Sequence, residues 1–446
     1  MTAVVGLLNK RGVAIAADSA VTRSRGRKGR KGTKCTKCTK NGSKMLRLSN
    51  AVPVSVMLTG NGDYIRNPWD VIVRRYRQQR GDIKHATVEA CMHDFFSYIA
   101  DTDIFWNETL VTNRWINNIL EWIFETANDN IDWEIKRKKN DGTYVRPKGY
   151  LNAFLKQLKI GQKVITRNGK CPQFEGYTIE QFREYAKPVI DDYFNELQRE
   201  DNDMPFKQIC PKDFLDAIRE EVEVTLMERL TRCMEDHDAS STLVFSGYGS
   251  EQEYPSLVAA HVCEGINHRV NYYVDPKNIV CISDERPVAY CPFAQRDVMM
   301  SLIRGQHRSW LGRVMNYTEH FYEKAESNLF SEKAEEQDLE FQTMLSEVKY
   351  DDIIVKFNKS VISLLDKNQR EWLKTLEQYD IKSMAALAQS LIDLTGFQRI
   401  LTFKQEGVGG PVDVAVITKN DGFTWLSRKS WYHHKDVNGM YGSMGI

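Results

Sequence analysis

The chain has 446 residues, so one core with large insertions, or two to three domains, is expected. The 61 Lys and Arg residues balance the 60 Asp and Glu residues, which excludes a global electrostatic field that would select nucleic acid or membrane. The nine cysteines form no disulfide-type framework, the N-terminal apolar run is broken at Asn9 and Lys10, and no segment has the ~20 apolar residues of a membrane span. These features predict a cytoplasmic protein without a membrane segment.

Alternating and apolar runs predict a strand-rich start, with a turn over 9–12 between the first two strands and strands over 3–8, 13–17, 45–48 and 52–58. Apolar residues at three- and four-residue spacing then predict a helix through Trp69 and Tyr76, with Asp63 as its N-terminal cap. A second helix is expected over 87–99.

Two helical blocks interrupt the strand pattern, over about 103–240 and about 295–378, and a shorter helix is expected over 382–394. Strands are predicted in SSTLVFSGYG, SLVAAHV, RVNYYV and NIVCIS, and at the C-terminus over 412–418 and 423–426. The simplest architecture is one α+β core with two helical insertions. Its expected parts are 1–102, which includes a basic loop over 23–43, then 103–240, 241–306, 307–380 and 381–446.

Thr2 follows Met1 directly, and a small second residue permits removal of the initiator methionine. A threonine hydroxyl is a poor nucleophile without a neighbouring base, and an N-terminal threonine carries a base in its own α-amine. The unperturbed pKa of that amine is roughly 7.7–8.0, so an appreciable fraction is neutral near neutral pH. Thr2 is therefore a candidate nucleophile.

Three more positions could support this chemistry. Asp18 ends the returning strand, where it is expected beside the first strand. Lys44 opens a later strand and offers a cation that would pair with Asp18 and lower the pKa of the Thr2 hydroxyl or amine. The turn at Thr59-Gly60 offers backbone N–H groups for an oxyanion.

Two parts of the sequence resemble the proteasome β-subunit family. The first is TAVVGLLNKRGVAIAADSAVT with SKMLRLS and LTGNGD after it, and the second is VGGPVDVAVITKNDGF, which is similar to the last strands of archaeal and bacterial β-subunits. The resemblance covers about 2–22, 43–102 and 381–427, with a fainter match around 241–306. It implies an N-terminal-nucleophile hydrolase fold, a four-layer αββα sandwich of two antiparallel sheets.

The resemblance also implies roles for individual residues. Thr2 would be the nucleophile and its amine the general base, Asp18 and Lys44 the supporting pair, and the Gly60 N–H the oxyanion donor. The family usually has a serine directly before the Gly-Gly pair and an aspartate three residues ahead of that serine. Here these positions hold Val408 and Gln405, and Glu406 is the candidate replacement for the carboxylate.

The segment from Arg23 to Lys44 holds ten Lys and Arg residues and no acid. We expect an anionic ligand at this basic loop, although a solvated charged loop is the alternative. Cys35 and Cys38 form a lone C-x-x-C without a second pair of ligands, so neither a metal nor another cofactor is expected. A redox pair and two exposed thiols are both open interpretations of these cysteines.

The sequence thus predicts a threonine hydrolase that cleaves peptide or other amide bonds. The competing hypothesis is an inactive scaffold that binds a protein or nucleic acid through its insertions and basic loop. By resemblance, a homo-oligomer is expected, and a regulatory or unfoldase partner is a further possibility.

Overall fold

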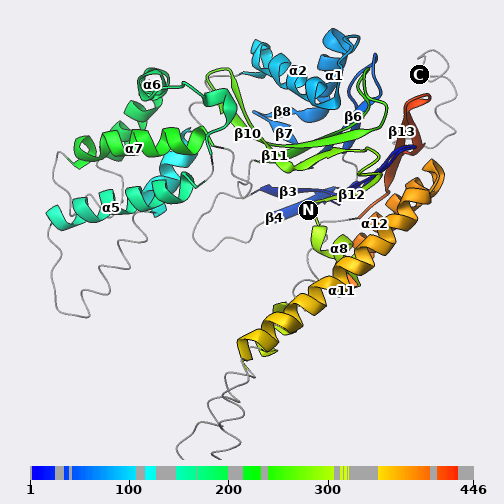
Figure 1. Ribbon diagram of the computed structural model, residues 1–446. Helices are drawn as coiled ribbons and strands as arrows, with labels where there is room; N and C mark the ends of the chain where they lie inside the picture. The colour runs from blue at the N-terminus through cyan, green and yellow to red at the C-terminus, as the bar shows by residue number, and fades with distance from the viewer. Residues whose placement is uncertain are drawn as a thin grey trace, which may run out of the picture.

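The structure is a computed structural model that describes residues 3–25, 35–39, 43–106, 116–126, 147–167, 169–198, 214–232, 240–305, 312–314, 316–318, 320, 350–401 and 409–429. Its fold is mixed α+β, as predicted from the sequence, and contains two five-stranded antiparallel sheets (Figure 1). No helix within these ranges is long and apolar enough to cross a membrane.

The first sheet has the order β12-β1-β2-β13-β14. Its strands are β1 (Val4–Asn9), β2 (Gly12–Ala17), β12 (Val288–Phe293), β13 (Asp413–Thr418) and β14 (Gly422–Ser427). Val4 lies opposite Ala17 in one ladder, and Asp413 lies opposite Ala17 in the next. The start of β1, the end of β2 and the start of β13 therefore meet at one end of the sheet.

The second sheet has the order β11-β10-β9-β6-β5. Its strands are β5 (Met45–Arg47), β6 (Val54–Gly60), β9 (Ser241–Gly247), β10 (Ser256–Ile266) and β11 (Arg269–Cys281). The start of β5 lies beside the end of β6, because the Leu58 N–H donates to the Lys44 carbonyl at 2.8 Å.

The two sheets share one apolar core. The inward residues of both sheets alternate along their strands, and they include Val4, Leu8, Val13, Ile15, Met57, Val244, Leu257 and Ala259. A Cβ atom on Gly6 would lie 3.1 Å from Leu257 Cδ1, so glycine at this position lets β1 approach the facing sheet closely. The sheets are thus packed face to face.

Helices cover the outer face of each sheet. The helices α1 (Trp69–Arg80) and α2 (Val88–Ala100) share a buried core with the second sheet. The helices α8 (Arg296–Arg304) and α12 (Ile381–Leu401) pack on the first sheet together with the C-terminal part of α11 (Tyr350–Gln378), and their buried residues share a core with those of β1, β2 and β13. The rest of α11 projects away from the sheets (Figure 1).

The first predicted insertion is helical where the structure describes it. It contains residues 117–126, α5 (Pro147–Ile165), α6 (Ile179–Gln198) and α7 (Phe214–Leu230), with short 3-10 turns at Asp103–Phe105 and Pro172–Phe174. These helices form a core of their own, to which β10 adds Cys263 and Ile266. The block lies to one side of the sheets, at the end of the β10–β11 hairpin (Figure 1).

Several predicted elements differ from the structure. Asp63 is not a helix cap but lies in the short strand β7 (Asp63–Tyr64), which pairs with β8 (Asn67–Pro68), and α1 begins after Pro68 without a side-chain cap. The expected loop over 23–43 is partly strand, since β3 (Val21–Arg25) pairs with β4 (Cys35–Thr39).

Two differences concern the middle of the chain. The strand β12 was not predicted, and the two strands expected in RVNYYV and NIVCIS are one strand, β11, with a register irregularity against β10. The two terminal strands were predicted correctly, including the turn between them.

Candidate active site

The hairpin of β1 and β2 brings Ala3 and Asp18 side by side. The Ala3 N–H donates to Asp18 Oδ1 at 2.8 Å, and the Asp18 N–H donates to the Ala3 carbonyl at 3.1 Å. Thr2 lies outside the described residues. The nitrogen that binds Asp18 is nevertheless the one that joins Ala3 to Thr2 in the peptide bond.

Asp18 forms a buried ion pair with Lys44, as the sequence predicts. Lys44 Nζ lies 2.6 Å from Asp18 Oδ1, and the two side chains are 7% and 0% exposed. The second carboxylate oxygen accepts the Ala20 N–H at 3.3 Å and the Gly409 N–H at 3.1 Å. A buried ion pair needs such additional hydrogen bonds because both ions lose their hydration. Here each carboxylate oxygen has protein donors.

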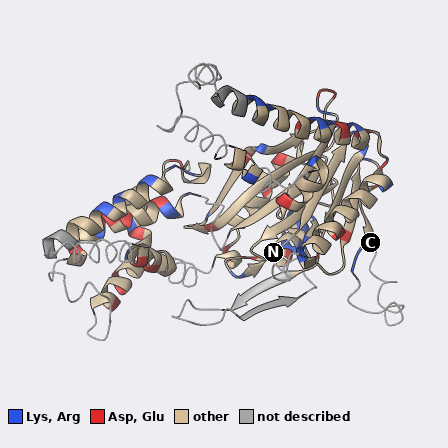
Figure 2. Ribbon diagram, turned by 90° about the horizontal axis from the view of Figure 1, so that it is seen from below, with Lys and Arg blue, Asp and Glu red and all other residues tan. Residues whose placement is uncertain are grey.

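These charges contrast with the strands around them. The central strands β1, β2, β6 and β9 contain no Lys, Arg, Asp or Glu, and Figure 2 shows most of the charge on helices and connecting segments. Asp18 and Lys44 stand directly after β2 and directly before β5. Ionisable residues that are buried at strand ends, rather than exposed on helices, are candidates for a functional site.

Gly60 ends β6, two residues beyond the contact of Leu58 with Lys44. Its φ angle is +83°, and an added Cβ would come within 2.5 Å of the Ser240 carbonyl oxygen. Only glycine fits both conditions without strain. The fold therefore requires glycine at this turn. The turn lies near the Asp18–Lys44 pair, because Leu58 of the same strand binds the backbone carbonyl of Lys44.

Glu406, the candidate carboxylate, lies outside the described residues, as do Gln405 and Val408. Gly409, the first described residue after them, reaches Asp18 through its backbone N–H. We did not predict this contact from the sequence. The Gly-Gly pair of the C-terminal motif was the only signal that pointed to this segment.

Cys291 is a thiol in β12, the strand that pairs with β1. It lies opposite Gly6 in the ladder of β12 with β1 and is buried. Burial raises the pKa of the Cys291 thiol to about 12, so the thiolate is not formed near neutral pH. Cys291 is therefore not a competing nucleophile.

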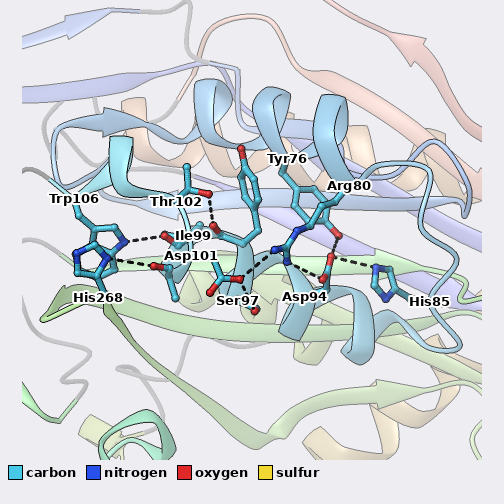
Figure 3. A network of polar contacts seen from close by, with 12 residues as sticks. Tyr76, Arg80, His85, Asp94, Ser97, Ile99, Asp101, Thr102, Trp106 and His268 are labelled. Atoms are coloured by element: carbon cyan, nitrogen blue, oxygen red, sulfur yellow. Dashed lines mark hydrogen bonds and ion pairs between the residues drawn. The ribbon is translucent and has the colours of Figure 1, made fainter.

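A second polar cluster joins the outer helices α1 and α2 (Figure 3). Asp94 accepts hydrogen bonds from the Tyr76 hydroxyl at 2.8 Å and from Arg80 at 3.1 Å, and Arg80 also binds Asp101 at 3.1 Å. These hydrogen bonds run from α1 to α2 or to Asp101, the residue that follows α2. The cluster joins α1 to α2 and includes neither Asp18 nor Lys44.

The described residues contain no group of three or more His, Cys, Asp or Glu side chains that could hold a metal ion. No protein-family model matches the chain, and no curated protein matches it either.

Proposed function

We propose that the protein is an N-terminal-nucleophile hydrolase of amide bonds, with Thr2 as nucleophile after removal of Met1. One observation carries this proposal: the buried Asp18–Lys44 pair binds the backbone nitrogen of Ala3, the residue next to Thr2. An ion pair costs desolvation energy, and a structural role alone would be filled as well by apolar residues. A role in the chemistry of the neighbouring N-terminus accounts for its position.

The layer order supports the same assignment. A four-layer αββα sandwich requires two sheets packed face to face with helices on both outer faces. Here the two antiparallel sheets have α1 and α2 on one outer face, and α8, α11 and α12 on the other. We propose that the chain adopts this N-terminal-nucleophile hydrolase sandwich. The helical segment from α5 to α7 is then an insertion into it.

In the proposed reaction, Thr2 Oγ attacks the carbonyl carbon of the substrate, and the hydroxyl proton moves to the α-amine of Thr2. The tetrahedral oxyanion is stabilised by the Gly60 N–H. The C–N bond then breaks, the leaving amine takes the proton, and an ester with Thr2 forms. Water attacks this ester with the α-amine as base, which releases the acid and restores Thr2.

Asp18 and Lys44 hold the start of the chain in this proposal, and Lys44 contributes positive charge that favours the alkoxide character of the attacking oxygen. The proteasome family has an aspartate at the position of Gln405. In this chain Glu406 would supply the carboxylate near the terminal amine instead.

We also propose that substrates carry negative charge. The register of β3 and β4 puts Arg23 directly opposite Lys37, with Arg25 two residues further along the same strand. The segment from Arg23 to Lys44 holds ten Lys and Arg residues and no acid, and a segment of this charge favours an anionic partner. Val21 starts β3 three residues after Asp18, which brings the base of this hairpin to the candidate site. Acidic peptides or other anionic amides are the substrates that fit.

The second candidate function is an inactive scaffold, favoured by Val408 and Gln405 at positions where the proteasome family has a serine and an aspartate. The insertions would then bind a protein partner. Homo-oligomerisation and a regulatory or unfoldase partner are proposals compatible with either function.

Hydrolysis assays separate the two functions. We expect the purified protein to cleave amide substrates with acidic residues, Thr2→Ser to retain measurable activity because it keeps a hydroxyl, and Thr2→Ala to lose it. Equal rates for the wild type and Thr2→Ala, or a mature protein that retains Met1, would favour the scaffold.

A further inference from the structure

A second buried ion pair lies beside the Asp18–Lys44 pair. Lys429, two residues beyond β14, places its Nζ 3.2 Å from Asp413 Oδ2, and the two side chains are 7% and 3% exposed. The Lys429 N–H also donates to Asp413 Oδ1 at 2.8 Å. Backbone and side chain of Lys429 thus both bind the same carboxylate at the start of β13.

Ser19 connects this pair to the candidate site. Its Oγ accepts a hydrogen bond from Lys429 Nζ at 3.1 Å and donates one to the Pro411 carbonyl at 2.6 Å. The side chain is fully buried, and its proton is already given to a carbonyl. Ser19 is therefore not a second nucleophile, despite the neighbouring lysine, and its hydroxyl instead joins β2 to the segment before β13.

The segment from Gly409 to Asp413 is consequently held at several points along its length. Pro411 is bound by Ser19, Asp413 by Lys429, and the Gly409 N–H donates to Asp18 Oδ2. Gly409 and Gly410 have φ angles of +138° and +85°, which other residues rarely adopt. Two glycines in succession have little conformational preference of their own, so the contacts that follow them set the path of the chain.

We infer that Lys429 is a positioning residue of the Thr2 site, which it serves through Ser19, Pro411 and Asp413. The ammonium group fixes the segment 409–413, and the fixed segment presents the Gly409 N–H to Asp18. Asp18 in turn holds Lys44 and the nitrogen of Ala3. The inference rests on the proposed function for its effect on chemistry, but the link from Lys429 to Gly409 is a structural claim that can be measured separately.

The test uses three variants of the full chain. Ser19→Ala removes only the bridging hydroxyl, and the double variant Lys429→Met/Asp413→Asn removes both charges so that no buried carboxylate is left unpaired. Arg428→Met is the matched control, because Arg428 is the exposed neighbour of Lys429 and stacks on the Trp425 ring at 5.0 Å. It removes the positive charge next to Lys429 without touching the segment.

Two quantities are measured, namely hydrogen exchange of the 409–413 backbone and the rate of Thr2 modification by an electrophilic peptide probe. In Ser19→Ala and the double variant, exchange at Gly409 should be about tenfold faster. The modification rate at saturating probe should fall about tenfold, while the half-saturating concentration stays unchanged. Arg428→Met should match the wild type in both.

Unchanged exchange at Gly409 would overturn the inference, as would faster exchange with an unchanged modification rate. If the wild-type protein is not modified at all, the proposed function fails, and the exchange measurement alone then decides whether Lys429 positions this segment. Loss of folding in the double variant leaves Ser19→Ala to decide, since it removes one hydroxyl only.

Discussion

Asp18 is the residue on which the candidate site depends. Its carboxylate receives hydrogen bonds from the backbone of Ala3, Ala20 and Gly409 and from the side chain of Lys44. These donors come from the residue before β1, the segment between β2 and β3, the segment before β13 and the residue before β5. One buried carboxylate thus joins both sheets at a single point.

Replacement of Lys44 by Met should lower stability and abolish the chemistry together. The buried Asp18 carboxylate loses its counter-ion, and a broken buried pair costs about 3–5 kcal/mol of unfolding free energy. In Asp18→Asn/Lys44→Met, both charges are absent and most of the stability should return, whereas reaction of Thr2 with an electrophile should not. Denaturant unfolding and probe labelling measure the two effects. A double variant that is labelled at the wild-type rate would show that the pair has only a structural role.

The cysteines should differ in reactivity according to burial. Cys281 is exposed, whereas burial raises the pKa values of the Cys91 and Cys291 thiols to about 12 each. Peptide mapping after alkylation at about pH 8 should therefore find Cys281 modified and the other two unmodified until the protein is unfolded. Modification of Cys291 at the rate of Cys281 in the folded protein would contradict the burial of β12.

The same two thiols make stability depend on alkaline pH. Their folded pKa of about 12 lies above the ordinary value of 9.0, so the unfolded chain releases protons first as pH rises. Stability from these groups is therefore fully present below pH 9.0 and is lost as pH rises toward about 12. Substitution of both cysteines by Ala should reduce this alkaline loss in a series of denaturant unfolding curves.

Sequence reasoning could find Asp18 and Lys44 but not the contacts that complete their surroundings. The pair was predicted from the resemblance of the first segments to a family, together with the expected hairpin. The hydrogen bond from Gly409 to Asp18 and that from Lys429 to Ser19 span 391 and 410 positions of the chain. No local pattern encodes such contacts, because they follow from the tertiary placement of β13.

At the scale of single elements, β12 shows why a strand was missed. It contains Pro292 and follows Pro287, and prolines within a short run argue against a strand. Yet β12 is the edge strand of its sheet, where a residue without an N–H group can face away from the neighbouring strand β1. The hairpins of β1 with β2 and β13 with β14 were predicted because their turns are short and their strands apolar.

The hairpin of β3 and β4 should determine preference for charged substrates. In Arg23→Gln/Arg25→Gln/Lys37→Gln, we expect kcat/KM for an acidic peptide to fall about tenfold at low salt through a higher KM. A neutral peptide of the same length should be unaffected, and the difference should vanish in about 0.5 M salt.

The control for this experiment is Lys156→Gln/Lys159→Gln/Lys163→Gln, which removes the same charge from exposed positions of α5 in the helical insertion. An equal loss in both triple variants would mean that net charge, rather than the hairpin, attracts the substrate.

At the scale of the whole molecule, the chain divides into a layered body and a helical insertion with its own core. The sequence predicted the helices of the insertion through their periodicity. It did not predict that Cys263 and Ile266 of β10 extend into that core, because the expected strand SLVAAHV ends at Val262. The insertion is therefore attached to the second sheet by packing as well as by chain connection.

Truncation of a core residue of the insertion should act locally. Phe182 is fully buried among the helices, and Phe182→Ala should cost about 3–5 kcal/mol. Hydrogen exchange should become faster in α5, α6 and α7, whereas β1, β2 and β13 should keep their protection. Phe397→Ala, at a residue of α12 that is 59% exposed, should change neither region. Equal loss of protection throughout would show that insertion and sheets unfold as one unit.

The central claim is that Thr2 is a nucleophile made competent by the surroundings of Asp18. Intact mass before and after treatment with a threonine-directed electrophile tests it most directly, with Thr2→Ala treated in parallel. The account predicts a wild-type protein that lacks the mass of Met1 and gains one adduct, and a Thr2→Ala protein that gains none. A retained Met1, or an adduct of equal yield in Thr2→Ala, would contradict it.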